Sequence, residues 1–299
     1  MTGLGALIKR NTKLFFKDKG MFFTSLITPL ILLVLYATFL ADVYKDSFNM
    51  GLPESLRLDG TLLDGVVGAQ LFSSLLAVCC ITVSFCSNML MVQDKASGAR
   101  RDIVITPVKG HVMAIAYYIS TVLTTLIICY VAMAVCLIYI AFIGWYMTLV
   151  DVLLLVLDVF LLVMFGTVLS SIINFFLSSQ GQISAVGTVV SAGYGFICGA
   201  YMPISQFGEG LQKAISFFPG TYGTSLLRNH AMRGAFEEMK AKGFPTEIIE
   251  NMKNAVDCNL YFFESKVALP VMYAVLAGSV ALLMSIYVLI NILNGKKAK

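Results

Sequence analysis

The chain has 299 residues, of which 58% are hydrophobic and only 13% charged, and its mean hydropathy is +0.85. A soluble domain of this length needs more polar surface to cover its core, so the composition excludes one and indicates a polytopic α-helical membrane protein. The net charge of +4 does not indicate nucleic-acid binding, because the basic residues gather in short segments between apolar runs.

The first 19 residues predict an amphipathic helix. Leu7 and Ile8 fall on one helical face, and Arg10 and Lys13 fall on the opposite face. Such a helix lies in the membrane interface with its basic face toward anionic headgroups. The alternative is a signal peptide, but the apolar run 21–41 is too long for one and lacks a cleavage site.

Six apolar runs follow, and each is long enough to cross about 30 Å of hydrocarbon as a helix. They cover residues 21–41, 61–92, 111–143, 148–177, 183–202 and 267–293. The connecting segments include a polar loop over 42–60 and a charged loop over 93–110. A long mixed segment covers 203–266 and holds short helical patterns at 236–242 and 246–256. We therefore expect an all-α fold, with an interfacial helix over 1–19 and a single six-span transmembrane domain over 20–299.

The charges between these runs predict the orientation. Twelve Lys and Arg but three acidic residues lie in the N-terminal segment, the 93–110 loop and the C-terminal tail, whereas the rest of the chain holds nine basic and 14 acidic residues. Basic short loops stay on the cytoplasmic side. We expect a multi-pass plasma-membrane protein with both termini and the 93–110 loop in the cytoplasm, and with segment 203–266 outside.

The sequence holds few candidates for chemistry. It has no G-x-x-x-x-G-K-[ST] phosphate loop, no Ser/His/Asp set and no H-E-x-x-H motif, so we expect no catalytic residue, ATP site or metal site on this chain. His111 and His230 are interpreted as interface residues. Asn88 and Asn174 could line a cavity or join helices. Asp158 lies within an apolar run, where a carboxylate costs roughly 2.5–3.5 kcal/mol; it is either a substrate or proton site or a buried hydrogen-bonding partner of another helix.

The seven cysteines show no metal or redox spacing. Six lie in apolar runs, where a free thiol behaves as a small hydrophobic group, and Cys258 lies in a polar segment. A disulfide framework is therefore not supported, and a bridge between Cys198 and Cys258 is conceivable only if both face outside.

Two motifs carry a family resemblance. In the 93–110 loop, an acidic–basic pair precedes a glycine, charged residues and an apolar pair follow, and Thr-Pro closes the motif: Asp94, Lys95, Gly98, Arg100, Arg101, Asp102, Ile103, Val104, Thr106 and Pro107. After the fifth run come Gly199, Pro203, the apolar pair Leu211 and Ile215, Pro219, Tyr222 and Arg228. In this order the motifs resemble the membrane subunit of a type-2 ATP-binding-cassette exporter, although Ala96 and Arg101 stand where Glu is common.

The resemblance implies a permease subunit that is not itself an enzyme. It would pair with a second copy or a similar permease and bind two ATPase subunits, which hold ATP and Mg, while membrane lipid surrounds it. The 93–110 loop would be the ATPase-coupling loop, with 103–105 fixing its helix to the bundle. Residues 199–228 would form an outer re-entrant segment, and the second and fifth spans would line the pathway.

The expected function is therefore the efflux of an amphipathic substrate, such as a drug, an antimicrobial peptide or a lipid-like molecule. The resemblance does not extend over residues 235–266. Two alternatives are a proton-coupled secondary exporter that uses Asp158 and a non-transporting membrane immunity or scaffold protein.

Overall fold

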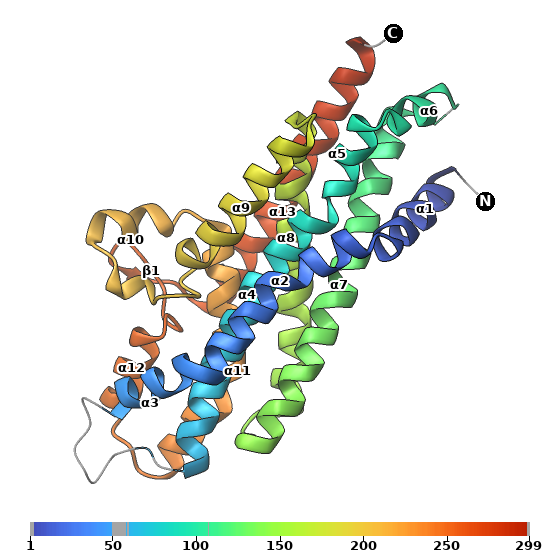
Figure 1. The fold of residues 1–299 in the computed structure, drawn as a ribbon. Helices are drawn as coiled ribbons and strands as arrows, with labels where there is room; N and C mark the ends of the chain where they lie inside the picture. Colours follow the sequence, from blue (N-terminus) through green and yellow to red (C-terminus); the bar gives the residue numbers. More distant parts are fainter. Residues whose placement is uncertain (1–2, 50–57, 59, 107, 298–299) are drawn as a thin grey trace.

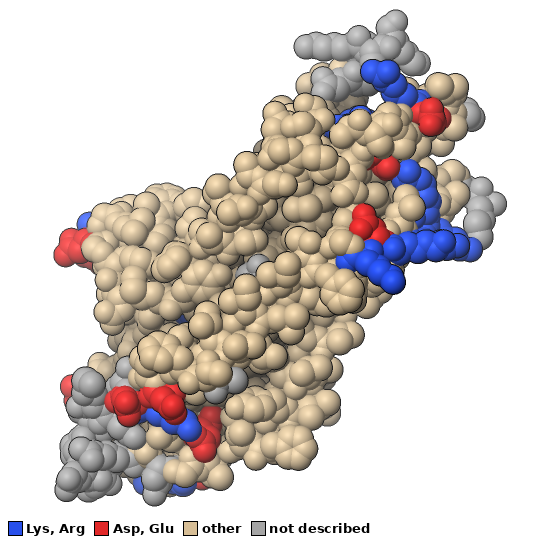
Figure 2. Space-filling view, in the orientation of Figure 1, with Lys and Arg blue, Asp and Glu red and all other residues tan. Residues whose placement is uncertain are grey.

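The computed structural model describes residues 3–49, 58, 60–106 and 108–297 of the chain. These residues form an elongated bundle of helices (Figure 1), in which α1, α6 and the C-terminus lie at one end. We call this the α6 end, and the end with α3 and the α7–α8 connection the opposite end. Basic side chains gather at the α6 end, whereas acidic side chains are prominent at the opposite end (Figure 2).

The N-terminal part is one short helix followed by one long, bent helix. Helix α1 (Gly3–Lys17) is separate from α2 (Lys19–Leu35), because the Asp18 carboxylate caps α2 by accepting from the Met21 amide at 3.1 Å. A π-helical turn, η1 (Tyr36–Leu40), then leads into α3 (Ala41–Asn49). The predicted polar loop 42–60 was therefore wrong at its start, which is helical; residues 50–57 and 59 of this loop lie outside the described part of the chain.

The remaining helices include the other apolar runs. They are α4 (Gly60–Ser87), α5 (Met89–Ala96), α6 (Ala99–Ile105), α7 (Gly110–Ile143), α8 (Leu149–Phe176), α9 (Gln180–Ile197) and α13 (Leu269–Lys297). Within the described residues, five helical segments are long and apolar enough to cross a membrane: Lys19–Asp46, Gly60–Ala96, Gly110–Ile143, Leu149–Phe176 and Leu269–Leu293. Helix α9 is not one of them, since it has only 18 residues and begins with Gln-Gly-Gln. The all-α membrane fold is confirmed, and the sixth span stays a prediction.

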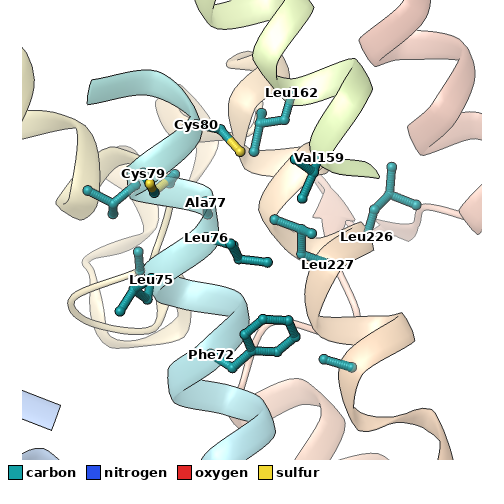
Figure 3. Packing of buried hydrophobic residues seen from close by; sticks show 14 of the residues in the cluster. Phe72, Leu75, Leu76, Ala77, Cys79, Cys80, Val159, Leu162, Leu226 and Leu227 are labelled. Carbon is teal, nitrogen blue, oxygen red and sulfur yellow. The ribbon is translucent and has the colours of Figure 1, made fainter. Parts of the chain in front are cut away.

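Helix α4 forms the centre of the bundle. It packs against α2, α7, α8, α9 and α11, and nearly all of its side chains from Val66 onward are buried. Apolar residues from α4, α8 and α11 meet along its length (Figure 3). Helix α8 approaches closely because Gly166 faces α4: an added Cβ there would lie 2.7 Å from Ile81 Cδ1 and 3.2 Å from the Cys80 carbonyl oxygen.

The segment after α9 differs most from expectation. It contains a 3₁₀ turn η3 (Ile204–Gln206), α10 (Glu209–Ile215), α11 (Pro219–Ala241), α12 (Thr246–Ala255) and a two-stranded antiparallel hairpin, β1 (Tyr261–Phe262) and β2 (Ser265–Lys266). The helix predicted at 246–256 is confirmed as α12. The short helix predicted at 236–242 was wrong, since these residues end the 23-residue α11. Segment 203–266 is not wholly peripheral either, because α11 is buried against α4, α8 and α13.

Candidate functional site: the coupling loop, its anchors and the groove

The predicted coupling loop is a helical corner at the α6 end. Helix α5 ends at Ala96, and Gly98 adopts a left-handed conformation with φ +84°, which glycine accepts without steric cost. Helix α6 then runs to Ile105, and the Thr106 hydroxyl donates to the Ile103 carbonyl oxygen at 2.5 Å. Thr106 is extended, as expected for a residue before proline; Pro107 itself lies outside the described residues.

Asp94 joins the loop to two other helices. Its carboxylate accepts two hydrogen bonds from the Arg10 guanidinium of α1, at 2.7 and 3.0 Å, and one from the Tyr117 hydroxyl of α7, at 2.5 Å. Asp94 is only 5% exposed, so these are strong charge-assisted bonds. The Asp94 carboxylate also raises the pKa of Arg10 above its ordinary value, so the guanidinium stays charged throughout the physiological range. Neither Arg10 nor Tyr117 was predicted as a partner, because nothing in the sequence links positions so far apart.

Lys95 points the other way and anchors the end of α8. Its ammonium donates to the carbonyl oxygens of Asn174, Phe175 and Leu177 at 3.0, 2.6 and 3.0 Å. These carbonyls lie at the C-terminus of α8, where the regular i+4 amide partners are absent and the helix dipole favours a cation. The acidic–basic pair of the motif therefore connects α1, α5, α7 and α8.

The residues after Gly98 face away from the bundle. Arg101 and Asp102 are exposed, and Arg100 is half-buried. Val104 and Ile105 are 59% and 84% exposed, so the expectation that 103–105 fix α6 to the bundle was wrong for two of the three residues; Ile103 alone packs against the core. A helix of seven residues therefore presents apolar and charged side chains together on its outer surface.

The second motif surrounds a buried ion pair near the middle of the bundle. Arg228 of α11 is fully buried and donates to Asp257 at 2.9 Å, to the Ser74 hydroxyl of α4 at 3.2 Å and to the Gly199 carbonyl oxygen. The Asp257 carboxylate also accepts from the Ile204 amide at 2.8 Å. This network ties the end of α9 to α4, to α11 and to the turn after α12, which holds Asp257.

The other residues of this motif shape the turns around the network. Gly199 has φ +71°, Pro203 precedes the 3₁₀ turn, and Pro219 occupies the first turn of α11, where its missing N–H costs nothing. The Tyr222 hydroxyl donates to the Ser216 carbonyl oxygen at 2.6 Å. Of the apolar pair, Ile215 is buried and Leu211 is 51% exposed.

Asp158 lies in a second buried cluster. One carboxylate oxygen is 2.6 Å from His230 Nδ1 of α11, and the other accepts from the Tyr273 hydroxyl of α13 at 2.6 Å. The interpretation of His230 as an interface residue was wrong, because it is buried between α11 and α8. Asn88 likewise joins helices, with its amide donating to the Ser170 and Ser171 hydroxyls of α8.

A groove of about 980 Å³ runs between α2 and α9, with α4 and α5 contributing Cys86, Met89 and Gln93. Its α2 side is apolar, with Ile27, Ile31 and Leu35, whereas its α9 side carries hydroxyl groups; these are Ser184, Thr188 and Ser191. The residues of each set recur at helical spacing, so each forms a stripe along the groove. The groove is therefore mostly apolar, with a line of hydroxyl groups along its α9 wall.

The described residues offer no grouping of three or more His, Cys, Asp or Glu side chains suited to a metal ion. Cys198 and Cys258 are both buried as free thiols, so the conceivable bridge between them is not formed.

Comparison with known proteins gives one match. No curated protein and no solved structure matches the chain significantly. A family model described as "ABC-2 type transporter" matches residues 2–231, which include α1, the coupling loop, the groove and most of α11. The match covers well over half of the sequence, and the chain therefore belongs to the ABC-2 type transporter family of membrane permeases.

Proposed function

We propose that this chain is the transmembrane permease subunit of an ATP-driven exporter and that α6 is the contact through which a separate ATPase drives it. Members of this family normally work with an ABC ATPase. The observation that carries the proposal is the exposure of Val104 and Ile105 beside Arg101 and Asp102 at the basic end of the bundle. An exposed apolar surface rimmed by charges is typical of a protein-binding site.

The anchors of α6 explain how a push on this helix would reach the membrane helices. Asp94 connects α5 to Arg10 of α1 and to Tyr117 of α7, while Lys95 connects it to the end of α8. Because these contacts are short and largely buried, α1, α5, α7 and the end of α8 would move together rather than bend independently. We infer that both termini and α6 lie in the cytoplasm, since basic residues gather at this end.

We propose that the groove between α2 and α9 forms one side of the export pathway and that a second permease chain forms the other side. Ala185, Thr188 and Val189 of α9 are exposed, and such small residues allow the close approach of another helix in a membrane. A second copy, or a similar permease, would complete the pathway there. From the sequence we expected the second and fifth spans, α4 and α9, to line the pathway. Because α4 is mostly buried and the walls of the groove come from α2 and α9, we propose that the first span, α2, lines it together with α9. A mostly apolar groove with a line of hydroxyl groups along α9 suits an amphipathic cargo.

The test is a double substitution of the two arginines of α6, of which Arg101 is exposed and Arg100 is half-buried. Arg100→Ala/Arg101→Ala should remove the stimulation of ATP hydrolysis by cargo in a reconstituted complex, and should leave membrane insertion and the helical circular-dichroism spectrum unchanged. Lys9→Ala/Lys13→Ala on α1 is the matched control, because it removes two exposed basic residues from the same end. Unchanged transport in the α6 variant would overturn the coupling role.

A further inference from the structure

An exposed aromatic patch lies beyond the α9–α11 corner. We define it as Phe217 and Phe218, which precede α11, together with Tyr261, Phe262 and Phe263 of the hairpin. The rings of Phe217 and Phe262 are 5.2 Å apart, and those of Phe262 and Phe263 are 5.0 Å apart, both edge-to-face. Even so, the five side chains remain between 39% and 63% exposed. Five large aromatic rings left facing outward in one place indicate a surface that is covered by something else.

The hairpin is held firmly, so the exposure is not that of a loose end. Glu250 of α12 binds Lys266 of β2 at 3.1 Å and the amide of Asn259, which precedes β1, at 3.1 Å, and it also binds Lys253 of its own helix at 3.0 Å. The Asn254 side-chain oxygen of α12 accepts from Asn259 at 2.7 Å and from the Tyr261 hydroxyl of β1 at 3.2 Å. The three donors to Glu250 lower the pKa of Glu250 to about 2, which keeps it charged at neutral pH. The hairpin therefore presents its rings in a defined position.

The position of the patch along the chain indicates what covers it. Strand β2 ends at Lys266, and the membrane-spanning part of α13 begins at Leu269. The first turn of α13 carries the exposed apolar side chains of Leu269 and Val271. The patch thus lies within a few residues of the point where the chain enters the membrane, and amphipathic aromatic belts occur at this depth in membrane proteins.

A polar surface adjoins the patch. A cavity of about 780 Å³ beside it is lined by Glu209 and Lys213 of α10 and by Glu264 of the hairpin turn, among other polar residues. Apolar rings on one side and charged groups on the other are the arrangement found in segments that lie in a membrane interface, where the rings reach acyl chains and the charges reach headgroups and water.

We propose that the aromatic patch inserts into the membrane interface beside the start of α13 and that membrane lipid is its occupant. The hairpin would then anchor the α10–α12 region to the leaflet beside the outer end of the pathway. The hairpin lies beyond residue 231, where the family match ends. The choice of the outer leaflet rests on the orientation in the proposed function, whereas insertion itself does not depend on transport.

The test uses the single tryptophan of the chain, Trp145. In a Trp145→Phe background, Phe263→Trp places the only indole in the patch. The protein is reconstituted into vesicles of phosphatidylcholine and phosphatidylglycerol, with and without bromine on the acyl chains, and iodide serves as the aqueous quencher. Glu247→Trp in the same background is the control, since Glu247 is exposed on α12, away from the patch.

Brominated lipid should reduce the indole emission of the Phe263→Trp variant by at least as large a fraction as that of Trp145 in the wild type, and iodide should quench this variant less than it quenches the Glu247→Trp control. Quenching by iodide but not by bromine would overturn the proposal by placing the patch in water. Protection from both quenchers would overturn it by showing that protein, such as a second copy, covers the patch. If Phe263→Trp fails to fold, Phe217→Trp tests the same surface. Since no ATPase is present, the result is independent of the coupling experiment.

Discussion

The Arg10–Asp94 contact gives the most quantitative prediction. Arg10→Ala removes two charge-assisted hydrogen bonds of 2.7 and 3.0 Å and leaves the Asp94 carboxylate with Tyr117 as its remaining partner. Breaking a fully buried ion pair costs about 3–5 kcal/mol. The Arg10 side chain is 32% exposed, so water reaches it and the cost falls; we expect a loss of about 2 kcal/mol in the free energy of unfolding.

The assay is reversible unfolding of the purified protein in SDS, followed by helical circular dichroism. Arg10→Lys should give an intermediate loss, because lysine keeps the charge but not the two-pronged geometry. Lys9→Ala, an exposed neighbour on α1, should change stability by less than about 0.5 kcal/mol. In a double-mutant cycle with Asp94→Asn, the two losses should not add. Additive losses, or an Arg10→Ala variant as stable as the wild type, would refute the proposed link between α1 and the coupling loop.

Three further predictions concern buried or anchoring residues. Asp158→Asn should weaken the contact with His230 and lower stability by about 1–3 kcal/mol, but ATP-dependent transport should persist; a folded variant that exports nothing would support the proton-coupled alternative. Gly199→Ala should destabilise the protein by about 1–2 kcal/mol in the same SDS assay, because φ is +71° and the added Cβ would lie 2.8 Å from Asp257 Oδ2; an equally stable variant would contradict this. The pKa of Glu250 in the folded protein lies below its ordinary value. The contribution of its contacts to stability is therefore complete above about pH 4.5 and is lost as pH falls toward about 2. The protection of the hairpin amides, measured against the intrinsic exchange rate at each pH, should fall over that range in the wild type but not in Glu250→Gln, whose protection should already be reduced at pH 7.

The apolar spans could be predicted from the sequence because each is a long run whose hydropathy alone requires a membrane or a core. Helix α11 could not. Its residues read as a mixed polar segment, yet Arg228, His230 and Thr224 are buried. Arg228 can be buried there because Asp257 neutralises its charge, and His230 because Asp158 shares a hydrogen bond with it. Such pairing joins residues far apart in the chain, which local periodicity does not reveal.

The coupling loop shows a similar limit. The sequence predicted a charged helix within the 93–110 loop, and α6 confirms it. The direction in which α6 faces was wrong, because two turns of helix with apolar residues at three consecutive positions have no single apolar face. A residue such as Ile105, 84% exposed, looks like an anchor in the sequence and like a docking contact in the structure.

The most direct test of the central claim is a pull-down of the tagged protein from detergent-solubilised native membranes, with mass-spectrometric identification of the bound chains. The account predicts a soluble ABC ATPase in stoichiometric amount, and predicts its loss from Ile105→Glu, which places a charge on the exposed end of α6 without touching the Asp94 or Lys95 anchors. An intact wild-type protein that reproducibly retains no ATPase would contradict the account.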